Sequence, residues 1–157
     1  MDKDLAQFLV RAKQAVFSGK VQKNANSTRP ASKDFGYVED NLKYIDTFIG
    51  SAKFAGEEAL WRDDAPIWAM NYIGRMLRDD YSVEFIKEAF EFLNQALTLA
   101  PEEHPFRGPS EHHDGDYSYK CTIEGDFHWF SGYEEMFYKG EKVYELVFHG
   151  GDVEQAG

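Results

Sequence analysis

Two pairs of adjacent glutamates, Glu57–Glu58 and Glu134–Glu135, are the side chains of this sequence best suited to binding chemistry, because each pair lies among aromatic residues. A carboxylate beside aromatic rings attracts an organic cation, and a cation over a ring face gains about 0.5–2 kcal/mol. A buried carboxylate without such a partner tends to take up a proton instead. The alternative is that these glutamates face solvent, or bond the backbone at a strand bulge near Gly56 and Gly132.

Rings and amides close to these glutamates in the sequence could complete such a site. We expect the ligand-binding residues to be Glu57, Glu58, Trp61, Asn71, Trp129, Tyr133 and Glu134. Asp46 and Asn71, in neighbouring predicted strands, could orient a ligand through polar contacts, or could be ordinary edge residues.

The stretch 111–116, Glu-His-His-Asp-Gly-Asp, contains residue types that bind metal ions. Neighbouring residues of a strand point to opposite faces, so His112 and His113 would converge on one ion only within a loop. An acidic loop with two solvated histidines is therefore the expectation, and no metal or other cofactor is predicted.

Signatures of catalysis are weak. Cys121 alternates with Tyr119 and Ile123 on a face that reads as buried, where a thiol behaves as a small hydrophobic group. The sequence has no Gly-x-Ser-x-Gly turn, phosphate-binding glycine loop or dinucleotide fingerprint. General acid–base chemistry by Glu58 and Glu134 stays open, but no catalytic residue is assigned.

Composition limits the class of protein. The 157 residues fit a single domain, 1–157. The 17 Lys and Arg against 28 Asp and Glu give a charge of −11, which argues against direct binding to nucleic-acid phosphates. One cysteine excludes an intrachain disulfide, and with no signal peptide recognised we expect a cytoplasmic protein. No apolar run reaches the roughly 20 residues that span a bilayer, so no membrane association is predicted.

The elements that must position these side chains follow from hydrophobic periodicity. Apolar residues at helical spacing predict two helices, from Asp4 to about Ser18 and from about Val83 to Leu99, the second capped by Ser82. Between residues 19 and 35 a polar loop is expected. Period-two alternation and turn residues predict six strands: Gly36–Gly50, with a bulge or break near Asp40–Asn41, Phe54–Trp61, Ile67–Gly74, Tyr117–Gly125, His128–Tyr138 and Lys142–His149.

The order helix, three strands, helix, three strands indicates an internal duplication. Residues 54–74 align without a gap on residues 130–150, so that Phe54 meets Phe130, Glu58 meets Glu134 and Tyr72 meets Phe148. With one residue of slack, Tyr44 meets Tyr119. The pseudo-repeats, about 3–74 and 81–150, predict an α+β fold in which a duplicated helix-plus-three-strand unit forms a curved antiparallel sheet with two helices on one face.

Alternation along the strands also assigns side chains to the two faces of that sheet. Beneath the helices we expect Trp68, Met70, Tyr72, Tyr144, Leu146 and Phe148. On the opposite face we expect Ala69, Asn71, Glu145, Val147 and His149. Glu58 shares a face with Phe54 and Leu60, whereas Glu57 shares one with Trp61.

The strings FAGEEALW, PIWAMNY and GDFHWFSGYEEMFYKGEKVYE resemble a bacterial family of unknown function, over nearly the whole chain. Members of that family occur alone or downstream of helix-turn-helix modules of Xre-type regulators. The resemblance implies no activity and no catalytic residues. It implies a context, because a domain attached to a DNA-binding module is often its sensor.

Together these patterns predict a small-molecule ligand-binding or sensing domain for a cationic or aromatic ligand, with its site on the concave sheet face or between the two repeats. One alternative is an enzyme of unknown reaction that uses the same acidic and aromatic cleft. Another is a protein-interaction module that forms a homodimer through the open face of the sheet.

Overall fold

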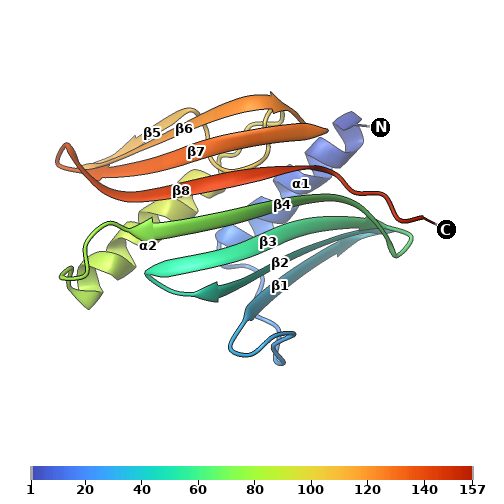
Figure 1. Cartoon of the computed structure of the whole chain (residues 1–157), viewed down its shortest axis with the longest axis horizontal. Helices are drawn as coiled ribbons and strands as arrows, with labels where there is room; N and C mark the ends of the chain where they lie inside the picture. Colours follow the sequence, from blue (N-terminus) through green and yellow to red (C-terminus); the bar gives the residue numbers. More distant parts are fainter. Residues whose placement is uncertain (1, 157) are drawn as a thin grey trace.

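The computed structural model describes residues 2–156 and contains two helices and one eight-stranded sheet. Both helices lie on the same face of the sheet (Figure 1). The elements in chain order are α1 (Asp2–Phe17), β1 (Lys33–Glu39), β2 (Leu42–Gly50), β3 (Lys53–Arg62), β4 (Ala65–Met76), α2 (Val83–Leu97), β5 (Glu111–Asp114), β6 (Tyr117–Asp126), β7 (Trp129–Tyr138) and β8 (Glu141–Asp152). None of the helices in this range is long and apolar enough to span a membrane.

The α+β class and the duplicated helix-plus-strands unit are confirmed, but each unit contains four strands rather than three. The expected strand 36–50 is a hairpin, β1 and β2, which turns at Asp40 with a φ of +52° and pairs Glu39 with Leu42. Asp and Asn adopt such conformations more easily than other non-glycine residues. The segment expected to be an acidic loop contains β5, a four-residue edge strand too short and too polar to give a periodic signal.

All strand pairs are antiparallel, in the order β1-β2-β3-β4-β8-β7-β6-β5. The two units meet at β4 and β8, where Tyr72 pairs with Phe148, its own counterpart 76 positions later. Trp68 pairs with Asp152 and Met76 pairs with Tyr144, which places the pairs symmetrically about Tyr72. A pseudo-twofold axis therefore passes between Tyr72 and Phe148.

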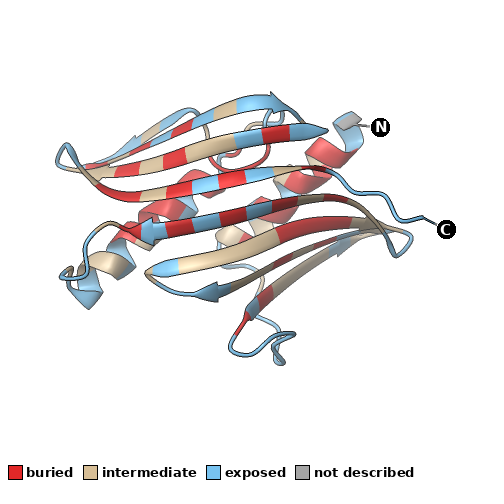
Figure 2. Ribbon diagram, viewed as in Figure 1, coloured by how far each residue is buried: buried red, intermediate tan, exposed pale blue. Residues whose placement is uncertain are grey.

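The predicted assignment of side chains to faces is confirmed. Buried and exposed residues alternate along β4 and β8 (Figure 2), with Tyr72 and Phe148 beneath the helices and Ile73 and Val147 on the open face. Ile73 is 64% exposed and Val147 is 51% exposed, so none of residues 2–156 covers the centre of the open face.

The helices form where the sequence predicts them. In α1 the buried residues are Leu5, Ala6, Phe8, Leu9, Ala12, Lys13 and Val16. The hydroxyl of Ser82 caps α2 by accepting a hydrogen bond from the Phe85 backbone N–H at 3.1 Å, which satisfies one of the free N–H groups at a helix start. The buried stripe of α2, from Ala89 to Leu97, packs on the core.

Two glycines let the rings at the pseudo-twofold axis lie flat on the neighbouring strands. Gly56 faces Tyr72 across the β3–β4 pair, and Gly132 faces Phe148 across the β7–β8 pair. A Cβ atom at Gly132 would lie 2.0 Å from Cζ of Phe148, and one at Gly56 would lie 2.5 Å from the Tyr72 hydroxyl. The matching contacts explain why glycine occupies both repeat positions.

We predict that Gly132→Ala lowers the free energy of unfolding by about 1–3 kcal/mol, because the methyl group overpacks the Phe148 ring. Gly36→Ala is the matched control in a strand, since its Cβ would meet nothing nearer than the Tyr44 carbonyl at 3.8 Å. Urea titration measures both variants. Equal stability of the two would contradict this account of the axis.

Candidate functional site

Glu58 on β3 and Glu134 on β7 are fully buried beneath the helices, and each is paired with a buried cation. Lys13, on α1, donates to both carboxylate oxygens of Glu58 at 2.9 and 3.0 Å. Arg107, in the loop after α2, binds Glu134 through Nε and Nη2 at 3.0 and 2.9 Å. Two cations and two carboxylates thus form a neutral set inside the core.

Tyrosine hydroxyls complete the coordination of both glutamates. Tyr44 donates to Glu58 at 2.8 Å, and its repeat counterpart Tyr119 donates to Glu134. Tyr144 also donates to Glu134, at 2.7 Å. The Lys13 ammonium makes a third bond, to the carbonyl of Phe106 at 2.8 Å. We call Lys13, Glu58, Arg107, Glu134 and these three tyrosines the buried ion cluster.

Burial and pairing act against each other in the pKa values of this cluster. Burial alone would raise the pKa of Glu134, but the Arg107 charge and the hydrogen bonds from Arg107, Tyr119 and Tyr144 outweigh it and hold the pKa below its ordinary value. Burial lowers the pKa of Lys13 despite the neighbouring Glu58. Both glutamates are enclosed and fully bonded, so the cluster is suited to holding α1 and the loop after α2 onto the sheet.

Asp46 is a third buried carboxylate beside this cluster. It lies opposite Glu58 in the β2–β3 pair and is only 2% exposed. Its Oδ1 accepts a hydrogen bond from the Tyr72 hydroxyl at 2.6 Å. Burial, reinforced by the charge of Glu58, raises the pKa of Asp46 to about 7. Both cations of the cluster are already bound to glutamates, so Asp46 has no dedicated counter-charge among residues 2–156.

The second repeat has no carboxylate at the corresponding position. Cys121 lies opposite Glu134 as Asp46 lies opposite Glu58. Burial raises the pKa of the Cys121 thiol to about 12, so the thiol stays neutral. The hydroxyl that binds Asp46 is missing there too, because the counterpart of Tyr72 is Phe148. The two repeats therefore differ where the first one holds an acid.

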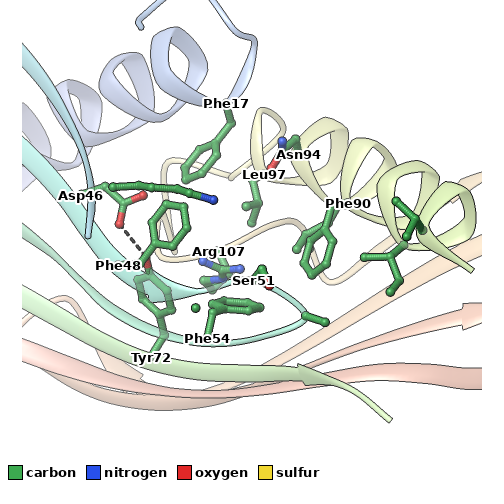
Figure 3. A pocket seen from close by; sticks show the side chains of 16 residues that line it. Phe17, Asp46, Phe48, Ser51, Phe54, Tyr72, Phe90, Asn94, Leu97 and Arg107 are labelled. Carbon is green, nitrogen blue, oxygen red and sulfur yellow. Dashed lines mark hydrogen bonds between the residues drawn. The ribbon is translucent and has the colours of Figure 1, made fainter. Parts of the chain in front are cut away.

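A cavity of about 500 Å³ borders Asp46, between α2, the end of α1 and strands β2–β4. Figure 3 shows rings from both helices and from strands β2, β3 and β4 around it, with the Asp46–Tyr72 hydrogen bond at one side. Its apolar lining consists of Phe17, Phe48, Phe54, Val83, Ile86, Phe90, Leu93 and Leu97. Asp46, Tyr72, Arg107, Lys33 and Asn94 supply the main polar groups.

In the second repeat a side chain of the protein covers the corresponding ring. Phe130 is the counterpart of Phe54, and the Phe106 ring stacks on it with centroids 3.7 Å apart and an interplanar angle of 3°. Phe106 also stacks on Trp68 and is fully buried. Phe54 contacts the rings of Phe90 and Tyr144, with centroids 5.9 and 6.4 Å away, and also borders the cavity. A side chain from the loop after α2 thus covers the ring of Phe130, whereas the ring of Phe54 borders a cavity.

The seven predicted binding residues do not meet at one place. Glu58 and Glu134 come together within the buried ion cluster, and Glu57 pairs with Asn71 across β3 and β4. Glu57 and Asn71 border a hollow of about 540 Å³ on the open face. Tyr133 borders a neighbouring hollow and donates to Glu145 at 2.7 Å.

The two tryptophans of the predicted site lie apart from both groups. Trp129 is 82% exposed at the start of β7. Trp61 is half-buried and lies opposite Lys43 in the β2–β3 pair. It follows the β-bulge at which the register of the β3–β4 pair shifts. The concave-face cleft shared by all seven residues is therefore not formed, because alternation sends Glu58 and Glu134 beneath the helices and Glu57 to the other side.

Sequence reasoning missed the cations and most of the cavity. Lys13 carries a readable signal, since it follows Leu9 by four residues and precedes Val16 by three, which places it on the buried stripe of α1. Arg107 lies in an irregular loop and gives no periodic signal. Among residues 2–156, no three His, Cys, Asp or Glu side chains are arranged to hold a metal ion.

A family model described as a domain of unknown function, DUF5680, matches residues 46–153. The chain belongs to the DUF5680 family. The DUF5680 match begins at Asp46 and includes Glu58, Arg107 and Glu134, whereas Lys13 and Lys33 lie before it. No curated protein and no solved structure matches the chain.

We predict that Lys13→Met lowers the free energy of unfolding by about 3–5 kcal/mol, because it leaves the Glu58 carboxylate buried without its cation. Adding Glu58→Gln to Lys13→Met recovers much of the loss, since the buried charge is then removed. Lys20→Met, at an exposed position, is the control and stays within about 0.5 kcal/mol of wild type. Denaturant unfolding measures these proteins together with the Glu58→Gln single variant, and additive effects of the two single substitutions would contradict the pairing.

The raised pKa of Asp46 predicts that the stability of the protein depends on pH. The folded pKa of Asp46 lies above the unfolded value of about 3.9, so its contribution to stability is complete below that value and is lost as pH rises through about 7. We expect Asp46→Asn to gain stability relative to wild type steadily between pH 4 and pH 7.5.

The control for this pH series is Asp34→Asn. The hydrogen bond from the Thr47 hydroxyl lowers the pKa of Asp34, so its effect on stability changes only on acidification below about pH 4. Thermal denaturation across the pH series measures both variants. Parallel curves for wild type and Asp46→Asn would refute the raised pKa.

Proposed function

We propose that this protein binds a small molecule with an apolar or aromatic body in the cavity between α2 and strands β2–β4. The volume of about 500 Å³ falls within the roughly 300–1,000 Å³ of small-ligand sites. Its wall combines several rings with a few convergent polar groups, the pattern that fixes the orientation of a ligand.

The observation that carries this proposal is the contrast between the two repeats. Phe106 stacks on Phe130 in the second repeat, whereas Phe54 borders the open cavity in the first. Apolar rings that border a solvent-accessible cavity lack the dispersion contacts and burial that a packed neighbour supplies. A ligand ring stacked on Phe54 would restore the contact that Phe106 makes in the second repeat.

A sensing role agrees with the family context expected from the sequence. If relatives lie downstream of helix-turn-helix modules of Xre-type regulators, ligand binding in this domain would control a DNA-binding neighbour. In a bacterial cytoplasm the ligand would be a soluble metabolite or an absorbed compound. The ion cluster offers a mechanical link, since Lys13 joins α1 to the sheet next to Asp46.

The two alternatives gain less support from the geometry. General acid–base catalysis by Glu58 and Glu134 would require access to substrate, and neither side chain borders the cavity. A homodimer through the open face stays a prediction, and exposed Ile73 and Val147 would lie in its interface.

We predict that Asn94→Trp abolishes binding of aromatic small molecules found by a thermal-shift screen of the wild type. Asn94 is exposed on α2 at the edge of the cavity, so a tryptophan there can enter the cavity without disturbing the core. A ligand at 100 times its dissociation constant stabilises the wild type by about 2.7 kcal/mol.

Lys87→Trp, at an exposed α2 position outside the cavity lining, is the matched control and keeps the response. Ligands that shift the melting temperature of the Asn94→Trp protein as much as that of the control would place binding elsewhere.

A further inference from the structure

The charges beside the cavity do not balance within the protein. Lys13 and Arg107 each form two hydrogen bonds to one glutamate, and a longer contact of 3.9 Å joins Arg107 to Glu58. Asp46 is the third carboxylate. When it ionises, the buried groups carry a net charge of −1 next to an open, ring-lined space.

Charged and titratable groups from several elements surround Asp46. Glu58 faces it from β3, Tyr72 from β4, Tyr44 from its own strand, Lys13 from α1 and Arg107 from the loop after α2. Lys33 on β1 also lines the cavity. Lys33 is exposed, its Nζ lies 5.7 Å from the centre of the Phe48 ring, and no ion pair joins it to Asp46 in the described chain.

We infer that the cavity selects a protonated amine attached to a flat aromatic ring, with the ammonium group at Asp46 and the ring against Phe54. This inference rests on the proposed function and specifies its ligand. An ammonium group supplies the missing positive charge and a donor for the Asp46 carboxylate. The ring takes the place that the Phe106 side chain takes in the second repeat.

An anionic ligand fits the same lining less well. The guanidinium of Arg107 is already held by Glu134 on one edge and lies over the Tyr72 ring at 5.2 Å. A carboxylate entering the cavity would approach Asp46 and, behind it, Glu58, and like charges at close range repel strongly where water is excluded. The rings of Phe17, Phe48 and Phe54 favour a cation in addition.

Lys33 distinguishes the two ligand classes by the sign of its effect. It lies at the cavity and carries a positive charge that repels an incoming ammonium group and attracts a carboxylate. Its removal therefore strengthens binding of an amine and weakens binding of an acid. Removal of the Asp46 carboxylate has the opposite effects: it weakens binding of an amine and strengthens binding of an acid.

The test measures three ligands with one ring system by calorimetry at pH 7.5: tryptamine, which is protonated, tryptophol, which is neutral, and indole-3-propionate, which is an anion. The proteins are wild type, Asp46→Asn, Asp46→Cys and Lys33→Met. Asp46→Cys copies the residue of the second repeat, so one of the two Asp46 variants keeps the test valid if the other folds poorly.

We expect the wild type to bind tryptamine about tenfold or more tightly than tryptophol. Both Asp46 variants lose this preference but keep their affinity for tryptophol, and Lys33→Met binds tryptamine more tightly than wild type does. Equal affinity for tryptamine and tryptophol, in wild type and variants alike, would overturn the inference and leave the proposed function standing.

Two other results would also overturn the inference. Tightest binding of indole-3-propionate, weakened by Lys33→Met, would identify an anion site in the same cavity. Failure of all three indoles to bind would reject the aromatic amine as the ligand class. The Asn94→Trp comparison against a wider screen then decides the proposed function separately.

Discussion

Burying carboxylates between a sheet and two helices requires a counter-charge for each of them, and this requirement shapes the centre of the molecule. Glu58 and Glu134 meet it through Lys13 and Arg107, which come from α1 and from the loop after α2. An unpaired buried charge costs several kcal/mol, so the ion pairs also fix where these two segments lie on the sheet. Asp46 meets the requirement only by keeping a proton, since its pKa is raised to about 7 by burial and by Glu58.

The duplication makes this exception informative. A pseudo-twofold axis between Tyr72 and Phe148 relates the two glutamates, two of their tyrosine donors, Tyr44 and Tyr119, and the glycines beneath the axial rings. Two departures from symmetry lie beside the cavity: Asp46 stands where the second repeat has Cys121, and Phe106 covers the ring of Phe130 but not that of Phe54. The two repeats therefore differ beside the cavity, and this difference is the basis for proposing a ligand there.

Local patterns in the sequence predicted much of the fold and little of the site. Alternation and helical spacing identified both helices, six strands, the duplication and the side chains beneath the helices, because each signal lies within one element. β5 was not predicted because its four polar residues show no hydrophobic periodicity. The cavity could not be predicted because its shape depends on how α2 packs against the sheet. The position of Arg107 could not be predicted because it lies in an irregular loop. Alternation placed Glu58 on the same face as Phe54 and Leu60, but the cations that bind Glu58 and Glu134 come from distant segments.

The central claim is that Asp46 exchanges its proton for the ammonium group of a ligand. Calorimetry of tryptamine binding in buffers with different ionisation enthalpies counts the protons released on binding. With a pKa of about 7 for Asp46, the account predicts release of nearly one proton per ligand at pH 6 and almost none at pH 8.5. Tight binding of tryptamine at pH 6 with no release of protons would contradict it.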